Sequence, residues 1–168
     1  SNWSRYHSYT HLSPSFFPHV ISSSPHPSHL FLISSSSALW VSEAQLEKTF
    51  RDFAASGLPL QITELDISVY PKQYDGREKQ LSETDTSFTE EKEEAQLKQY
   101  KMCFELFRMY RGLITGVTFW NISDRHSWLD NFPVKGRKDH PLLFDRNLKP
   151  KRAYYEIVNF WLSQGILF

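Results

Sequence analysis

The sequence predicts an α/β fold built from parallel strands. Segments with helical spacing of their apolar residues alternate with short apolar segments, in the order helix, strand, helix, strand, helix. Strands that alternate with helices are joined by crossovers and therefore run parallel. Both short segments are rich in apolar residues, as expected for strands that are covered on both faces. The length of 168 residues suits one domain.

The first forty residues differ in composition from the rest of the chain. Residues 1–40 are rich in Ser, Pro and His, and no acidic residue precedes Glu43. No helical or strand periodicity persists there, and the prolines break helices. We therefore expect a low-complexity segment that is disordered or not native coding sequence, followed by a folded part over residues 41–168.

The first helix is predicted for residues 42–57. Ser42 can cap its start and Gly57 can end it. Its apolar residues follow the three-and-four spacing of an amphipathic helix, and they are Leu46, Phe50 and Phe53.

The first strand is predicted for residues 61–69, and it carries two acids on the same side of its alternation. Strand interiors usually exclude acids, so Glu64 and Asp66 need an explanation. In a closed parallel barrel that side points inward, and near the carboxyl ends of the strands it forms the floor of the active site. The alternative is that one or both acids lie at a strand end and meet solvent or an arginine.

A polar loop over residues 72–86 precedes the second helix, predicted for residues 89–111. Ser87 or Thr89 can cap this helix, and the glutamates of its first turn suit the helix dipole. Its apolar stripe consists of Leu97, Tyr100, Phe104 and Phe107.

The second strand is predicted for residues 116–122 and the last helix for residues 151–163. Between them, residues 123–149 form a connection that is too long to serve only as a link, so we expect it to be functional. Pro150 is well placed near the helix start. The expected buried face of this helix consists of Tyr154, Ile157, Val158, Trp161 and Leu162.

The charge balance argues against some partners. Basic and acidic residues number 19 each, so the formal net charge is +0. Nucleic acids and anionic membranes attract a basic surplus, so we expect neither as a partner. No apolar run approaches the length of a membrane span, and no secretion signal is recognisable, so localisation stays open.

No metal or cofactor is expected. The histidine pairs His7 with His11 and His26 with His29 have spacings that bind metals on a helix, but their surroundings cannot hold a helix. Cys103, the one cysteine, lies among the apolar positions of the second helix. We expect it to be a buried small hydrophobic residue.

Two tryptophans follow the second strand. The segment "TFWNISDRHSWLDNFP" places Trp120 at the strand end and Trp128 eight residues later. Flat indole faces suit the CH-rich faces of sugar rings, and the polar residues between them can bind hydroxyl groups. Core packing is the alternative for either tryptophan alone. Together with the acids they indicate a carbohydrate site.

These residues resemble the C-terminal part of the glycoside hydrolase family 10 xylanases, over about residues 40–160. "QITELDISVY" resembles the seventh barrel strand of that family. "GVTFWNISDRHSWLDNFPVKGRKDHPLLFDRNLKPKRAYYEIV" resembles the eighth strand, the loop after it and the closing helix. The resemblance implies an incomplete (β/α)8 TIM barrel, made of the last two strands and their helices, and β-1,4-xylan or xylo-oligosaccharides as the bound sugars. Family members are commonly secreted.

By position, Glu64 matches the catalytic nucleophile of the family, and Asp66 matches the acid that orients this nucleophile through a histidine. Trp120 and Trp128 match the aromatic residues that enclose the sugar next to the scissile bond. Asn121 stands where the family often has Gly, which could alter the floor of the pocket.

Other family motifs are missing from this sequence. The general acid/base of the family is a Glu that follows Asn, and this chain has no Asn-Glu pair. The Gln-x-His motif of the sixth strand is also absent. The resemblance therefore implies a retaining endo-β-1,4-xylanase by descent whose present chain is inactive alone. Two alternatives stay open: a non-catalytic carbohydrate-binding remnant, or a structural α/β piece completed by another polypeptide.

Overall fold

The computed structural model describes residues 31–34, 41–70, 79–80, 87–132 and 134–163. Within these residues the helices and strands follow one another in the order strand, helix, strand, strand, helix, strand, two 3-10 turns, strand, helix. They are β1 (Phe31–Ser34), α1 (Glu43–Ala54), β2 (Leu60–Leu65), β3 (Lys79–Gln80), α2 (Glu90–Met109), β4 (Ile114–Phe119), η2 (Asp124–His126), η3 (Trp128–Asp130), β5 (Val134–Lys135) and α3 (Arg152–Ser163).

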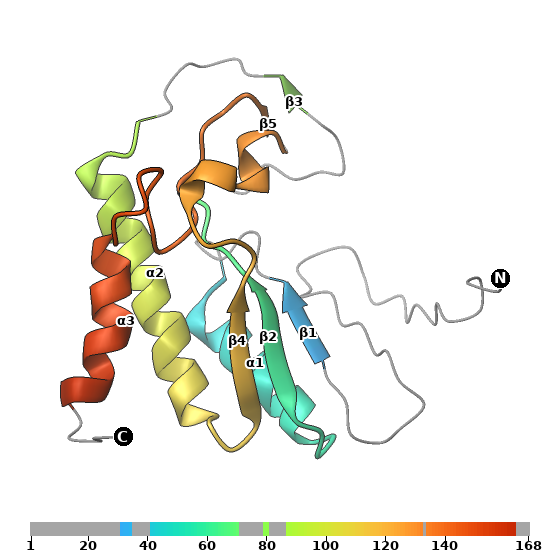
Figure 1. The fold of residues 1–168 in the computed structure, drawn as a ribbon. Coiled ribbons are helices and arrows are strands. Elements are labelled where there is room, and N and C mark those ends of the chain that lie inside the picture. Colours follow the sequence, from blue (N-terminus) through green and yellow to red (C-terminus); the bar gives the residue numbers. More distant parts are fainter. Residues whose placement is uncertain (1–30, 35–40, 71–78, 81–86, 133, 164–168) are drawn as a thin grey trace, which may run out of the picture.

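The main sheet has three strands in the order β1-β2-β4, and both pairings are parallel. The prediction of an α/β fold with parallel strands is therefore confirmed. In Figure 1, α1 lies behind the sheet, while α2 and α3 lie beside each other next to β4. The loop that follows β4, with η2, η3 and β5, lies beyond the carboxyl ends of the strands.

Strand β1 corrects the prediction that no regular element occurs in residues 1–40. Phe31–Ser34 pairs in parallel with β2, and Ser34 lies opposite Glu64. Four residues are too few to show periodicity, and the pairing with β2 supplies the hydrogen bonds that define this strand. The histidine pairs predicted not to bind metal lie outside the described residues.

A second correction concerns the polar loop predicted for residues 72–86. Lys79–Gln80 forms β3 and pairs in parallel with β5, which lies inside the connection after β4. The rest of that loop up to Thr86, together with Pro71 before it, falls outside the described residues.

The helix caps follow the predictions. The Ser42 side chain accepts a hydrogen bond from the Gln45 backbone amide, and the Gln45 side chain accepts one from the Ser42 backbone amide, which makes a capping box. Thr89, and not Ser87, caps α2 by accepting from the Lys92 backbone. Gly57, with φ of +68°, lies just beyond the end of α1, in a conformation that favours glycine.

One apolar core joins β2 to all three helices. Phe50 of α1, Tyr100 of α2 and Leu60 of β2 are completely buried within it, and Ile157 of α3 is 6% exposed. Cys103 is also buried in this core, as predicted.

Val158 does not belong to this core, because it is 42% exposed and lies on the outer side of α3. The prediction that it forms part of the buried face is therefore wrong. Trp161 and Leu162 belonged to the same predicted face, but their side chains lie outside the described set. None of the described helices combines the length and apolarity that crossing a membrane requires.

Both main strands end earlier than predicted. β2 ends at Leu65 and not at Val69, because the backbone beyond it bonds to a loop and not to a strand. The Ile67 amide donates to the Pro141 carbonyl, and the Val69 amide donates to the Asp139 carboxylate. The carboxyl end of β2 is therefore covered by the loop that follows β4.

Candidate active site

The two acids lie at the carboxyl end of β2, but Asp66 follows the strand and is not inside it. Leu60 and Ile62 are buried in the core, and so are Leu65 and Ile67, which are one residue out of phase with the first pair. An irregularity in the pairing with β4, between Ile62 and Leu65, accounts for this change of phase. Strict alternation would have placed Glu64 on the core side with Ile62. The irregularity removes it from that side and leaves it half-buried.

Trp120 lies beside this strand end. Its backbone amide donates to the Leu65 carbonyl at 3.4 Å, one residue from each of the two acids. Its side chain is 51% exposed, so core packing does not explain it. Just after β4, the Asn121 side chain donates to the His126 carbonyl and accepts from the Ile122 amide.

Trp128 reaches the same place from η3. Its indole Nε1 donates a hydrogen bond to Asp66 Oδ2 at 2.8 Å, across a sequence separation of 62 residues. Its ring stacks on Phe132, with centroids 5.7 Å apart and an interplanar angle of 22°. The side chain stays 37% exposed. The structure thus joins Trp128 to Asp66 directly, and it brings Trp120 to the same strand end.

The electrostatics of Asp66 are unusual. Burial raises the pKa of its carboxyl from 3.8 to about 7, the Trp128 hydrogen bond opposes this rise, and the charges of Asp139 and Glu64 add to it. Only 2% of the residue is exposed. Perturbed carboxyl groups of this kind are typical of functional sites, although buried structural networks produce them too.

The loop between β4 and α3 is held by two buried aspartates that the sequence analysis did not single out. Asp124 accepts from the Leu142 amide at 2.8 Å and from Lys151 Nζ at 3.1 Å. Lys151 is itself 7% exposed. Burial lowers its pKa, and the carboxylate of Asp124 counteracts this effect. A lysine directly after Pro150 at a helix start looks like an ordinary surface residue in the sequence, so no local signal marked this pair.

Asp130, the second aspartate, anchors the part of the loop that carries Trp128. It accepts hydrogen bonds from Arg146 at 2.6 Å, from the Asp139 amide at 2.9 Å and from Lys138 at 3.1 Å. Burial alone would raise its pKa, but these donors outweigh burial and hold the pKa below its ordinary value. Ser127 adds a further bond by accepting from the Leu129 amide.

A buried glutamine of α2 connects the loop to the segment after β2. Gln96 Nε2 donates to the Ile67 carbonyl at 2.7 Å and to the His140 carbonyl. Tyr100, one turn further on, donates to the Pro141 carbonyl at 2.6 Å. A polar residue next to an apolar helix stripe is the only sequence signal that could have indicated Gln96.

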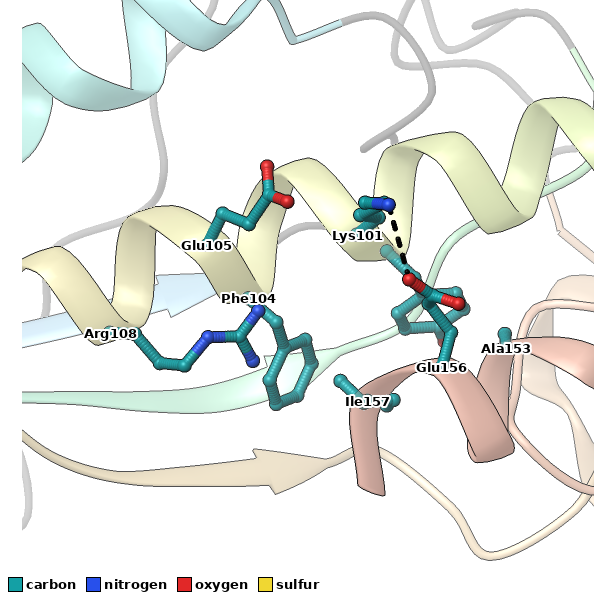
Figure 2. Close-up of a pocket in the computed structure, with 8 residues that line it drawn as sticks. Lys101, Phe104, Glu105, Arg108, Ala153, Glu156 and Ile157 are labelled. Carbon is teal, nitrogen blue, oxygen red and sulfur yellow. Dashed lines mark ion pairs between the residues drawn. The ribbon is translucent and has the colours of Figure 1, made fainter. Parts of the chain in front are cut away.

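A small hollow lies elsewhere in the molecule, and Tyr100 is one of the residues that line it. Figure 2 shows it between α2 and α3, where two of its lining residues, Lys101 and Glu156, form an ion pair at 3.3 Å. None of the four predicted site residues is among the eight that line it.

The sheet consists of three parallel strands with helices packed on it, and acids and exposed tryptophans lie at the strand ends. These features define the class of α/β proteins whose site lies at the carboxyl edge of a parallel sheet. The family model for glycosyl hydrolase family 10 matches residues 28–160. The chain belongs to this family, whose solved structures are TIM barrels. The match begins twelve residues before the predicted start at about residue 40, and it includes β1.

Individual relatives agree with this assignment. The chain is 44% identical over 121 residues to a β-1,4-xylanase of Dictyoglomus thermophilum, covering 72% of this chain and 33% of the relative. It is 50% identical over 117 residues to endo-1,4-β-xylanase A of Caldicellulosiruptor saccharolyticus, covering 70% and 32%. The chain therefore spans about a third of the length of these curated relatives.

Solved structures give the same result. The solved structure of a mutant protein in complex with xylotriose is 46% identical, with a TM-score of 0.65 over 77% of this chain and 38% of the other. An endo-1,4-β-xylanase from Caldicellulosiruptor owensensis is also 46% identical, with a TM-score of 0.61 over 80% and 37%.

Proposed function

We propose that this chain carries the nucleophile side of a retaining endo-β-1,4-xylanase site. Glu64 is the nucleophile, Asp66 orients the groups around it, and Trp120 and Trp128 contact the sugar. The ligands are xylan or xylo-oligosaccharides. The names of the relatives support the reaction class, and one neighbouring structure is a complex with xylotriose.

One observation carries the proposal. A half-buried glutamate and a buried aspartate lie at the strand end to which two partly exposed tryptophans are each hydrogen-bonded, Trp120 through its backbone amide and Trp128 through its indole N–H to the aspartate. A glutamate on the core side of the strand would be unable to reach a sugar. The phase change after Ile62 removes this obstacle.

In a retaining mechanism Glu64 attacks the anomeric carbon, and the bond from that carbon to the leaving oxygen breaks. A second carboxyl group, about 5–5.5 Å away, protonates the leaving oxygen and later activates water. The tryptophan faces hold the sugar ring, so that binding and chemistry use the same strand end.

We further propose that the chain alone does not perform the complete reaction. The sequence has no Asn-Glu pair. In the described part of the chain, Glu43 and Glu47 lie on α1 and Glu90 and Glu91 lie in the first turn of α2, so none of these four is on a strand. Losing general acid/base catalysis lowers rates by roughly 10²–10⁴-fold. In this proposal residues 41–168 form the C-terminal part of an incomplete barrel, and residues 1–40 form a low-complexity segment. Strand β1 and the family match from residue 28 favour an earlier start of the barrel part.

A substrate with an activated leaving group tests the nucleophile without needing the acid. With 2,4-dinitrophenyl 2-deoxy-2-fluoro-β-xylobioside, the Glu64 oxygen forms a bond to the anomeric carbon while dinitrophenolate departs as an anion, so no proton donor is required. We expect slow covalent labelling of the peptide that contains Glu64, detected by mass spectrometry, and none in Glu64→Gln. Labelling of another carboxylate would refute the assignment.

Xylan hydrolysis tests the second part of the proposal. We expect the purified chain to release reducing sugar from xylan no faster than its Glu64→Gln variant. A rate comparable with that of full-length relatives would show that a second carboxylate has been overlooked.

The exposed tryptophans also favour a second candidate, a carbohydrate-binding remnant without catalysis. Affinity electrophoresis in gels that contain xylan tests it, since migration should be retarded for the chain and restored by Trp128→Ala. If the chain neither binds xylan nor is labelled but forms a defined complex with another polypeptide, the third alternative, a structural piece, holds.

A further inference from the structure

Trp128 is the most strongly fixed of the exposed aromatic residues at the strand ends. Its backbone lies in η3, between Ser127, which caps the turn, and Asp130, which accepts three hydrogen bonds and is 4% exposed. Hydrogen bonds at Ser127 and Asp130 therefore fix the backbone at the start and end of this short turn, independently of the Trp128 side chain.

The indole is then held at two further points. The stack on Phe132 restrains the plane of the ring, and the hydrogen bond to Asp66 restrains its rotation within that plane. An indole has two side-chain torsions, so a stack and one directed hydrogen bond together restrict both of them.

Asp66 is suited to act as the fixed reference for this indole. It is 2% exposed and directly follows β2. The next residue, Ile67, donates to the Pro141 carbonyl at 3.0 Å and accepts from Gln96 at 2.7 Å. Because β2 and α2 hold the backbone around Asp66, its carboxylate does not move together with the indole. The position of this carboxylate therefore determines the orientation of the Trp128 indole.

We propose that Asp66 is a positioning residue for Trp128, and that its carboxylate orients the indole face that contacts the sugar. The part about the sugar rests on the proposed function, whereas the orientation of the indole does not. The resemblance assigns to Asp66 only an effect on the nucleophile, exerted through a histidine. The contact with Trp128 is a separate role, carried by this chain's own residues.

Indole N–H signals in ¹H–¹⁵N correlation spectra of the full chain test the orientation without any sugar. The chain has five tryptophans. Trp128→Phe identifies the signal of Trp128, and Trp120→Phe identifies that of Trp120 as an internal control. Asp66→Leu has a similar branched shape but no acceptor for the indole N–H. In this variant we expect the Trp128 signal to move toward the position of a solvent-exposed indole and its N–H to exchange faster with water, while the Trp120 signal stays in place. An unmoved Trp128 signal would overturn the proposal.

Sugar binding tests the consequence of this orientation. Ordering a side chain of this size at a binding surface corresponds to a change of about two- to tenfold in affinity. We expect Asp66→Leu to weaken xylotriose binding by this factor, and to have no further effect in a chain that already carries Trp128→Phe. Equal affinities of the wild type and Asp66→Leu, despite a moved indole signal, would contradict the proposal. If no variant binds xylotriose while the indole signal moves, the positioning role stands and the proposed function fails.

A reciprocal measurement covers the case in which Asp66→Leu does not fold. Trp128 is partly exposed, so Trp128→Phe is the milder change. Removing the N–H donor should raise the pKa of the Asp66 carboxyl further, as followed by its ¹³C signal during a pH titration. The nearby carboxylates Asp139 and Glu64 are present in both proteins and act equally on it. An unchanged Asp66 pKa in Trp128→Phe would show that the indole and the carboxylate are not coupled.

Discussion

Replacing Asp66 by Asn is expected to flatten the pH dependence of folding stability between about pH 4 and pH 8. Burial raises the pKa of this carboxyl from 3.8 to about 7 in the folded chain. The folded state therefore binds more protons than the unfolded state in this range. Stability is highest while Asp66 is protonated in both states, and it falls as the pH rises from the unfolded pKa through the folded one.

The magnitude follows from the size of the shift. Each pKa unit corresponds to about 1.4 kcal/mol, so a rise from 3.8 to about 7 corresponds to about 4 kcal/mol of unfolding free energy lost across the range. Asp66 is 2% exposed, so solvent screening reduces this value little. Burial also raises the pKa of Asp139, which contributes with the same sign and remains in the variant. Asp66→Asn should therefore remove a large part of the slope, but not all of it.

Urea unfolding followed by circular dichroism, repeated at several pH values, measures this slope. The matched control is Asp52→Asn, which changes the same atoms in an exposed carboxylate on α1. We expect the control to keep the slope of the wild type. If Asp66→Asn also keeps the full slope, Asp66 does not carry the shifted titration and the electrostatic description of the site is wrong.

Three further predictions concern the scaffold. Lys151→Met leaves the carboxylate of Asp124 buried without its cation, so it should lower the unfolding free energy measured in urea by about 3–5 kcal/mol. A loss below about 1 kcal/mol would show that the Lys151–Asp124 pair does not stabilise the fold. Gly57 has a φ of +68°, so Gly57→Ala should lower the unfolding free energy by about 1–2 kcal/mol. Gly112 has open space around it and no positive φ, so Gly112→Ala should lower the unfolding free energy clearly less, and equal losses would refute this explanation. Cys103 is buried and its thiol pKa is raised to about 12, so a disulfide reagent should modify it only in denaturant, and rapid modification of the folded chain would contradict this.

The local elements could be predicted because their signals are local. The caps at Ser42 and Thr89 depend on side chains within three residues of the helix start. The helix periods that marked Phe50 and Tyr100 as core residues need only the spacing of apolar residues, and the structure buries both. The outward position of Val158 escaped the same reasoning, because the width of a buried stripe depends on what packs against it.

The features that the sequence did not predict depend on pairing between distant segments. β1 is defined by its partner β2 and not by its own four residues. The end of β2 at Leu65 is set by a loop after β4, whose residues Asp139 and Pro141 bond to the backbone just beyond this strand. The change of phase that takes Glu64 off the core side arises in the pairing of β2 with β4. None of these features has a signature within a short window of sequence.

By itself the sequence determined the parallel α/β class, the helix starts and the four residues expected at the strand ends: Glu64, Asp66, Trp120 and Trp128. Only the tertiary structure decided that Asp66 is buried and accepts the indole N–H of Trp128, 62 residues away, and that Lys151 neutralises Asp124 beneath the loop. The physical reason is that helix periods and caps arise between neighbours in the chain. The burial and the partner of a charged group depend on which distant segments the fold brings against it.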